Sequence, residues 1–336
     1  MMPFPRFRYP LNALLVFCVL SILVSSACCD EIDLKNKKIL VVMGYHEDYP
    51  WHEETRVGIE SVLSTAQLNY FYMDTKRNLA DGEAKAKEAF ELYQALKPDA
   101  VIAAEDNVQS MFVVPYLMNK VKTPVIFCGV NDDATKYGYP AKNVTGILEK
   151  KHYRESISLL QLISPMVKKI AVLYRETPSN RTNIAQLEKE AKLYKAEISE
   201  FVRIENEHQL VTALADLQLR ADALLVLNLS GTPAKSGSPL SSEEVINLVN
   251  RYWGKPTLGV SAWEVEAGLL CAVAKLGQEQ GAVAARMAVE LMSGTDIELL
   301  PITQNRNGHR VINVGIAEQL GLKLKPIALI GAELVK

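Results

Sequence analysis

Two histidines and four acidic residues lie close together between positions 46 and 54 of the sequence. His46, His52 and the carboxylates around them are residue types that bind transition metals. The stretch His52-Glu53-Glu54-Thr55-Arg56 lacks the second histidine of the zinc-binding helix motif, in which two histidines are four residues apart. The spacing therefore predicts no metal site. We expect a solvated loop, followed by a helix whose first turn is acidic, as the helix dipole favours.

A second segment with residue types suited to chemistry is Gly259-Val260-Ser261-Ala262-Trp263. It is similar to a nucleophile elbow but lacks the second glycine of that motif. His152, His208 and His309 lie in polar contexts with no obvious acid partner. The sequence contains neither a P-loop nor a dinucleotide fingerprint. These observations predict no enzyme and no cofactor, and Ser261 is better interpreted as a hinge residue or a hydrogen-bonding group for a ligand.

The most informative segment for binding is the loop from Tyr45 to Trp51, which is rich in aromatic and histidine side chains. It follows the apolar run Ile39–Met43 and Gly44, a pattern typical of a strand that is buried on both faces. Helical periodicity resumes after the loop. The loop is therefore expected at the carboxyl end of a central strand, where open α/β sheets hold ligands. We interpret it as one wall of a binding site.

Polar and aromatic residues follow the other predicted strands in the same way. Rings there would supply apolar contact area, backbone amides at helix starts would bind an anion, and Asp132 or Glu176 would bind an ammonium group. For Trp51 and Trp263, packing in the core is the alternative to stacking on a ligand. The predicted ligand-binding residues are Tyr45, Trp51, Glu105, Asn131, Asp132, Tyr174, Glu176, Asn228, Ser230, Thr232, Ser261 and Trp263.

Short apolar runs alternate with helical patterns along the chain, which predicts the α/β fold class with parallel sheets and right-handed crossovers. Ser241 and Glu244 have the spacing of a capping box, Asp106 or Asn107 would cap a helix that runs through Met118, and Ser179-Asn180 would cap another. The predicted strands are 39–43, 69–74, 100–104, 125–128, 143–148, 168–173, 201–204, 223–227, 257–260 and 269–273. Because 336 residues is long for one core, we expect two doubly wound, Rossmann-like lobes with a hinge and a ligand cleft between them.

The first 27 residues have the features of a signal peptide: Arg6 and Arg8, an apolar segment from Leu11 to Val24, and small residues before Cys28. Cleavage after Ala27 gives a soluble exported protein, whereas lipid attached to Cys28 gives a membrane-tethered lipoprotein. The sequence leaves both outcomes open. The protein is thus expected in the periplasm or outside the cytoplasmic membrane, with membrane contact only through such an anchor.

The overall composition is that of an ordinary globular protein, with 49% hydrophobic and 23% charged residues and a formal net charge of −2. No basic patch or tail is present, so nucleic acid is not expected as a partner. Cys128 and Cys271 both lie in apolar, strand-like runs. A disulfide between them is compatible with export, but two buried small hydrophobic residues is the favoured interpretation.

A set of loosely defined motifs in a fixed order resembles the exported substrate-binding proteins of one ABC-transporter family. The motifs are Gly129-Val130-Asn131-Asp132, Asn143-Val144-Thr145-Gly146, 268–273, Gly281, Ser293-Gly294, Pro301, 311–314, Ala317, 320–322 and Pro326. The resemblance covers about Lys37 to Leu334. It implies the type I periplasmic-binding-protein fold, and some members of that family are associated with aromatic amino acids.

The resemblance also implies how the chain is divided and what the protein does. Residues 36–149 and 263–294 would form the N-terminal lobe, and residues 150–262 and 295–336 the C-terminal lobe. The protein would capture a small amino-acid-like or aromatic molecule and deliver it to an ABC permease. The alternative is a sensory protein that signals to a membrane histidine kinase or chemoreceptor. A DNA-binding repressor of the same fold is excluded, because the leader occupies the position where such a repressor has its DNA-binding domain.

Overall fold

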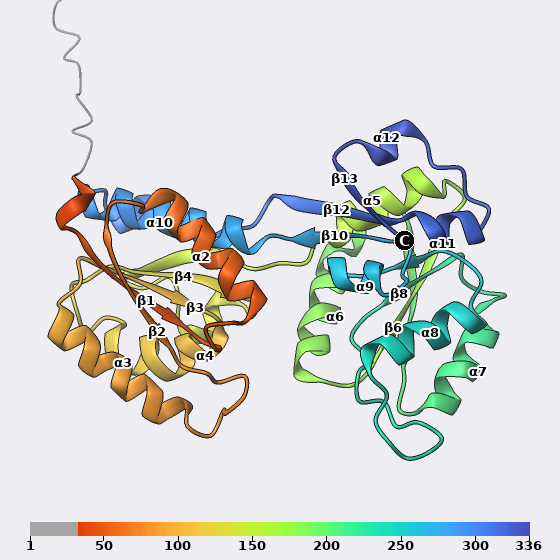
Figure 1. Ribbon diagram of the computed structural model, residues 1–336, viewed down its shortest axis with the longest axis horizontal. Coiled ribbons are helices and arrows are strands. Elements are labelled where there is room, and N and C mark those ends of the chain that lie inside the picture. Colours follow the sequence, from red (N-terminus) through yellow and green to blue (C-terminus); the bar gives the residue numbers. More distant parts are fainter. Residues whose placement is uncertain (1–32) are drawn as a thin grey trace, which may run out of the picture. The chain divides into compact units, whose positions relative to one another are not determined.

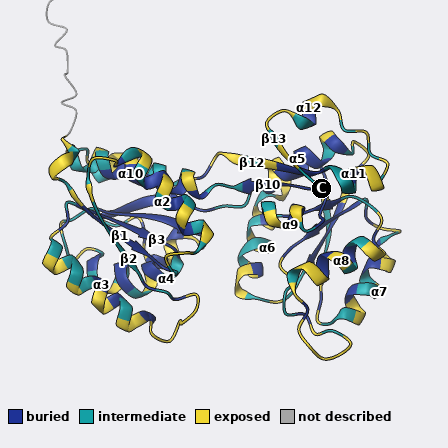
Figure 2. Cartoon of the chain, viewed as in Figure 1, coloured by how far each residue is buried: buried dark blue, intermediate teal, exposed yellow. Residues whose placement is uncertain are grey.

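Most of the predicted apolar runs become strands of two separate sheets in the computed structural model, which describes residues 33–336. Residues 34–336 form one compact unit. The predicted leader and Cys28 lie outside the described residues. We call each sheet with its helices a lobe. Figure 1 shows the helices flanking each sheet, and Figure 2 shows that the central strands of each lobe are buried. The predicted α/β fold class with two parallel-dominated sheets is confirmed.

The first lobe contains a fully parallel six-stranded sheet in the order β11-β5-β4-β3-β1-β2. Its strands are β1 (Lys38–Met43), β2 (Gln67–Tyr72), β3 (Ala100–Ala104), β4 (Val125–Val130), β5 (Val144–Leu148) and β11 (Thr303–Gln304). Its helical elements are η1 (Leu34–Asn36), α2 (Pro50–Val62), α3 (Gly82–Leu96), α4 (Asp106–Val108), the π-helix η2 (Gln109–Leu117), η3 (Ala134–Tyr137), α10 (Gly277–Met292) and η5 (Ile297–Leu299).

Alternate residues of β1 point to opposite faces of the first sheet, as a strand buried on both sides requires. Leu40 and Val42 pack in one core with α3 and η2. Ile39 and Val41 pack in the other core with α2 and α10. Each face is therefore covered by helices, and the polar ends of the strands are left for function.

The second lobe contains a seven-stranded sheet in the order β13-β12-β10-β9-β8-β6-β7, parallel except for the antiparallel pair of β10 and β12. Its strands are β6 (Lys169–Tyr174), β7 (Glu197–Arg203), β8 (Ala223–Val226), β9 (Thr257–Leu258), β10 (Cys271–Lys275), β12 (Gly308–Asn313) and β13 (Ala332–Val335). Its helices are α5 (Tyr153–Ile163), α6 (Pro178–Glu190), η4 (Ala191–Leu193), α7 (Glu207–Leu217), α8 (Ser242–Tyr252), α9 (Ala262–Glu266), α11 (Val314–Gln319) and α12 (Pro326–Leu329).

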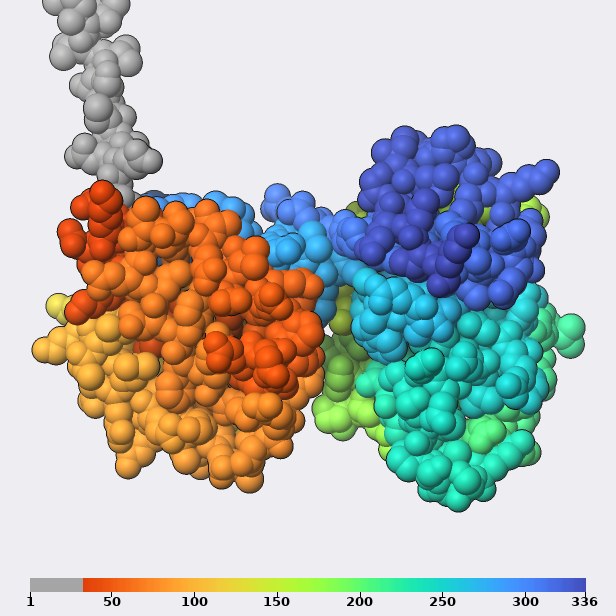
Figure 3. All heavy atoms as spheres, in the orientation of Figure 1, coloured from red at the N-terminus to blue at the C-terminus, as the bar shows by residue number. Residues whose placement is uncertain are grey.

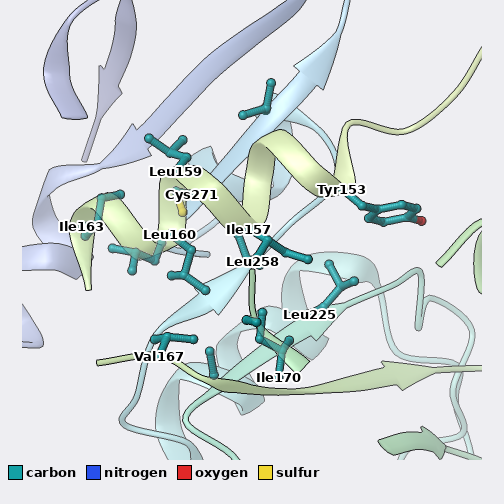
Figure 4. Close-up of a cluster of buried hydrophobic side chains, with 14 of the residues drawn as sticks. Tyr153, Ile157, Leu159, Leu160, Ile163, Val167, Ile170, Leu225, Leu258 and Cys271 are labelled. Carbon is teal, nitrogen blue, oxygen red and sulfur yellow. The ribbon is translucent and has the colours of Figure 1, made fainter. Parts of the chain in front are cut away.

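The cores of the second lobe follow the same rule, with α5 and α6 on one face of the sheet and α7 and α8 on the other. Figure 4 shows the first of these cores, in which Ile157 and Leu160 of α5 lie close to Leu258 and Cys271. Cys128 and Cys271 are both free and buried, so the favoured interpretation of the two cysteines is confirmed. Burial raises the pKa of both thiols.

The chain changes lobes at different residues from those expected. Residues 271–275 pair with β9 and β12 in the second sheet, although the segment from Trp263 was expected in the first lobe. Thr303 and Gln304 pair with β5 in the first sheet, although residues after Gly294 were expected in the second lobe. An apolar run shows that a strand is buried but not which sheet it joins. The crossings therefore follow β5, β10 and β11.

Local capping was predicted with mixed success. The capping box of Ser241 and Glu244 is present at the start of α8. The helix of residues 178–190 is capped by Thr177, whose hydroxyl accepts from the Asn180 amide, and not by Ser179-Asn180 as predicted. The helix expected to run through Met118 becomes the short α4 and then the π-helix η2, which contains Pro115. Within residues 33–336, no helix is both long and apolar enough to span a bilayer.

Candidate functional site

The predicted aromatic wall is present after β1 as a cluster of rings that pack on one another. Tyr45 stacks on His52 with ring centroids 5.2 Å apart, and Tyr49 packs edge-on against Tyr45 at 5.1 Å. The Lys76 ammonium lies 4.3 Å from the centroid of the Tyr49 ring and 4.8 Å from that of Tyr45, and it donates to the Tyr49 hydroxyl. Burial, with a smaller effect from the Glu105 carboxylate, raises the pKa of Tyr45. The two tyrosines therefore present flat, partly buried surfaces.

Behind these rings, Glu105 is buried in an unusual backbone conformation. Its φ is +84°, a region that non-glycine residues seldom occupy. Its Oε1 lies 3.5 Å from Nε2 of His52, and neither atom has a hydrogen-bond partner among the described residues. Gly129 leaves the space that the carboxylate needs, because a Cβ there would lie 2.9 Å from Oε1 of Glu105. Strain of this kind is typical of functional sites.

The burial of His52 corrects the expectation of a solvated loop. The side chain is 1% exposed because α2 begins at Pro50, which places His52 in the first turn of the helix with its ring facing Glu105. The ring's Nδ1 also lies 3.2 Å from the His46 carbonyl oxygen. Residues 33–336 contain no group of three or more histidine, cysteine or acidic residues arranged to hold a metal ion.

Asn131 and Asp132, which follow β4, are positioned by a carboxylate from the neighbouring strand exit. The carboxylate of Asp106 accepts from the backbone N–H groups of Asn131 (3.1 Å) and Asp132 (3.3 Å) and from the Tyr137 hydroxyl (2.7 Å). Burial and this carboxylate raise the pKa of Tyr137. The loop after β4 is therefore tied to the loop after β3, which brings Glu105, Asn131 and Asp132 to one edge of the first sheet.

Trp51 is held by a cation from the end of β10. The Lys275 ammonium lies 4.2 Å from the centroid of the Trp51 ring and forms an ion pair with Glu149, which follows β5. Burial lowers the pKa of Lys275 to about 8, although nearby carboxylates, Glu105 foremost, act in the opposite direction. Trp51 therefore contacts the place where the chain crosses between the lobes.

Sequence reasoning missed Lys275, Glu149 and His52 as members of this cluster. Lys275 had a usable signal, since it is the first charged residue after an apolar strand, as at the other strand exits. The burial of His52 had no comparable signal, because the two residues that follow it, Glu53 and Glu54, are acidic and exposed or half-buried.

In the second lobe, the loops after β6 and β8 are joined by the buried side chain of Asn180. Its Nδ2 donates to the carbonyl oxygens of Arg175 and Asn228, both at 2.8 Å. The guanidinium of Arg175 donates to the Ser230 carbonyl oxygen, and Asn228 accepts from the Ser230 amide. The predicted residues Asn228 and Ser230 thus lie beside the residues that follow Tyr174. Tyr174 itself is half-buried against the core.

Glu176, Thr232, Ser261 and Trp263 differ in what they can offer a ligand. Glu176 is exposed and pairs with Arg181 at 3.0 Å. Trp263 is 47% exposed and lines a small hollow together with Asn228. Ser261 forms the capping box of α9 with Glu264. Thr232 is fully buried, and its hydroxyl donates to the Leu229 carbonyl oxygen, so this side chain stabilises a turn.

These features define a class of protein: an α/β binding protein with two sheets, in which polar and aromatic residues gather at strand exits and no nucleophile–base pair is assembled among the predicted site residues. The model of the family described as ABC transporter substrate binding protein matches residues 56–336. The chain belongs to this family. It is a substrate-binding protein and not an enzyme.

Several solved structures have the same fold as this chain. A Streptococcus pneumonia ABC domain in complex with L-Trp is 20% identical, with a TM-score of 0.60, and the match covers 90% of this chain and 100% of that one. A ligand-free, open substrate-binding protein with adhesive properties from Clostridium difficile is 18% identical, with a TM-score of 0.70 and coverage of 89% and 99%. A conserved domain protein from Vibrio cholerae is 20% identical, with a TM-score of 0.58 and coverage of 90% and 100%. No curated protein matches the sequence.

Proposed function

We propose that this protein is an exported solute-binding protein that captures an aromatic, amino-acid-like molecule between its two lobes and delivers it to an ABC importer. The observation that carries the proposal is the position of Trp51, whose ring is held by Lys275 at a lobe crossing and which follows Tyr49 of the tyrosine cluster by two residues in the sequence. An aromatic ring beside a cation and next to further tyrosines is suited to a ligand with both a flat apolar part and an anionic group.

The charges at the strand exits supply the rest of the recognition. Lys275 would bind the carboxylate of the ligand while remaining within reach of Glu149. Asp132 in the first lobe or Glu176 in the second would bind its ammonium group. The Streptococcus protein with the same fold was solved with L-Trp, which supports a ligand of this class for a site that is rich in tyrosine and tryptophan.

The mechanism would be hinge closure. The chain crosses between the sheets three times, after β5, β10 and β11, so a change in these short linkers moves one lobe against the other. A ligand that contacts both lobes stabilises the closed state by its extra contacts there. The closed form would be the one that the membrane permease recognises.

The proposal is tested by native mass spectrometry of the mature protein after gentle purification, followed by small-angle scattering with the ligand found. A panel of aromatic amino acids in a thermal-shift assay covers the case of an empty protein. We expect a retained or added ligand of this class and a smaller radius of gyration when it is bound. The proposal would be overturned if no aromatic amino acid or related molecule bound, or if binding left the radius unchanged.

We further propose that the protein acts outside the cytoplasmic membrane, either free or held by lipid on Cys28. A Cys28→Ser variant separates the two forms. If the thiol carries lipid, the wild-type protein sediments with membranes and the variant does not. If the protein is released, both stay in the supernatant.

A further inference from the structure

Beside the linkers lies a cavity of about 590 Å³ that is separate from the cluster around Trp51. We call it the linker groove. It is formed by the residues that follow β5, by one side of α6 and η4, and by the segment after β11. Its lining includes the basic residues Lys150, Lys151, Arg154, Lys189 and Arg306 and the acidic residues Asp133, Glu155 and Glu190.

The linker groove shares only Asn131 with the twelve residues predicted to bind the ligand. Consecutive residues of the linker explain the separation. Glu149 pairs with Lys275 beside Trp51, whereas the next residue, Lys150, lines the groove and donates through Nζ to the Asn131 carbonyl oxygen at 2.7 Å. Neighbouring side chains on an extended segment point to opposite sides. The groove therefore lies on the other side of this linker from Trp51, and it meets the predicted ligand residues at Asn131 and at Asp132, whose carboxylate accepts from the Thr182 hydroxyl at 3.4 Å.

The acidic side chains of the groove already have partners. Asp133 accepts from the amide and hydroxyl of Thr135, and these hydrogen bonds lower its pKa. Glu155 lies 3.6 Å from Nδ1 of His152, which lowers the pKa of the carboxyl. Glu190 accepts from Gln186 and from the Tyr194 hydroxyl. Each carboxylate is engaged by a neighbouring side chain or backbone group.

The basic side chains are not engaged in the same way. The side chains of Lys151, Arg154, Lys189 and Arg306 form no hydrogen bond or ion pair with any described residue. Burial lowers the pKa of Lys150 and Lys151, and nearby carboxylates oppose this effect only in part. Five basic and three acidic side chains line the groove, so its lining carries an excess of positive charge.

We propose that the linker groove binds a small oxyanion with two or more negative charges, such as a phosphate compound or a polycarboxylate. The guanidinium groups of Arg154 and Arg306 match the paired oxygens of both classes, and Lys189 adds a point charge. The volume is within the usual range of small-molecule sites.

Such an anion would act on the linkers themselves. Asn305 joins them, because it donates to the Lys150 carbonyl oxygen at 3.0 Å and accepts from the Lys150 amide at 2.7 Å. Gln186 of α6 is bonded to Lys151 in the same reciprocal way. An anion held by Lys189 and Arg306 would connect α6 to the linker after β11 and, through Asn305, to the linker after β5. It would therefore shift the equilibrium between hinge positions without touching the ligand at Trp51.

The test is isothermal titration of the mature protein with pyrophosphate and, separately, with citrate, at constant ionic strength set by sodium chloride. The two probes distinguish a phosphate from a carboxylate ligand. The test variant is Lys189→Gln combined with Arg306→Gln. Its matched control is Lys192→Gln combined with Lys195→Gln, which removes the same charge from exposed positions outside the groove.

We expect at least one probe to bind the wild type and the control alike, and to bind the test variant about tenfold or more weakly, the loss typical for hydrogen bonds to charged groups. Circular dichroism verifies that all forms are folded, and the single variant Lys189→Gln replaces the double one if it is not. No binding of either probe to the wild type, or equal weakening in test and control variants, would overturn the proposal. A protein that binds an aromatic ligand but no oxyanion would leave the proposed transport function intact.

Discussion

The imidazole of His52 and the carboxylate of Glu105 face each other in the interior of the first lobe, with Nε2 and Oε1 3.5 Å apart and both side chains at most 3% exposed. One comes from the first turn of α2 and the other from the end of β3. The pair thus connects the aromatic loop to a strand exit at which the backbone is strained. It fixes the back of the proposed binding wall.

Replacing His52 by alanine should destabilise the protein by about 3 kcal/mol, because it leaves a buried carboxylate without its partner and creates a cavity. The measurement is urea unfolding followed by circular dichroism. Glu53→Ala, in the same helical turn but exposed, is the control and should change stability by less than about 0.5 kcal/mol. Equal effects of the two substitutions would show that His52 and Glu105 do not interact.

Helices α2 and α10 touch through glycines, so a single methyl group should separate them. A Cβ at Gly281 would lie 2.0 Å from the Thr55 carbonyl oxygen, and one at Gly58 would lie 2.2 Å from that of Gln278. In Figure 3, the blue surface of α10 adjoins the orange surface of α2, although the two helices are far apart in the sequence.

We therefore expect Gly281→Ala to lower the free energy of unfolding by about 2 kcal/mol through overpacking. Gly315→Ala is the control, since the space at that helical position accommodates a methyl group and alanine favours a helix there by up to about 1 kcal/mol. Thermal unfolding measures both. A stabilising effect at Gly281 would contradict the close contact of the two helices.

The stability of the protein should rise with pH in the alkaline range because of Lys275. Its pKa is about 8 when folded and about 10.4 when unfolded, so between these values the unfolded chain binds more protons. Relative to Lys275→Met, the wild type should gain stability from about pH 8 to pH 10, as followed by urea unfolding at several pH values. Parallel pH profiles would refute a buried, destabilised ammonium group at this position.

The three tryptophans should report ligand binding differently. Trp253 is buried in the second lobe, whereas Trp51 is half-buried beside Lys275 and Trp263 is exposed. Trp51→Ala should weaken binding of an aromatic ligand by about 1–3 kcal/mol, measured by calorimetry. Trp51→Phe should retain most of it. In the combined Trp51→Phe and Trp263→Phe variant, Trp253 is the one remaining tryptophan, and its fluorescence emission should not change when ligand is added. A change that persisted in this variant would argue against ligand contact at Trp51 and Trp263.

Much of the fold follows from local patterns, and the predictions were best where such patterns decide the structure. β3 has the predicted bounds, because acidic residues, Asp99 and Glu105, lie at both ends of its apolar run. The lobe crossings could not be predicted in this way. Cys271–Ala274 is as apolar as β3, and only pairing with β9 and β12 places it in the second sheet.

The candidate site was predictable to the extent that ligand-binding groups follow strands. That reasoning found Tyr45, Trp51 and Glu105, which the structure brings close to His52 and Lys275. It could not reveal that Asp106 and Asn180 act by holding loops, because those roles depend on hydrogen bonds between segments distant in sequence. It also included Thr232, whose hydroxyl is taken up by a turn.

The chain leaves the second sheet at the end of β10 and re-enters it at the start of the adjacent strand β12 (Figure 1). The two points lie opposite each other, because Lys275 is paired with Gly308. Everything between them, including α10 and β11, belongs to the first lobe. During synthesis one face of the first sheet therefore lacks α10, one of its two covering helices, until Met292 has left the ribosome, and the sheet lacks its last strand until Gln304 has. We expect a nascent chain stopped at Glu149 to be cut readily by protease in its first lobe, and protection to appear only when nearly the whole chain has emerged.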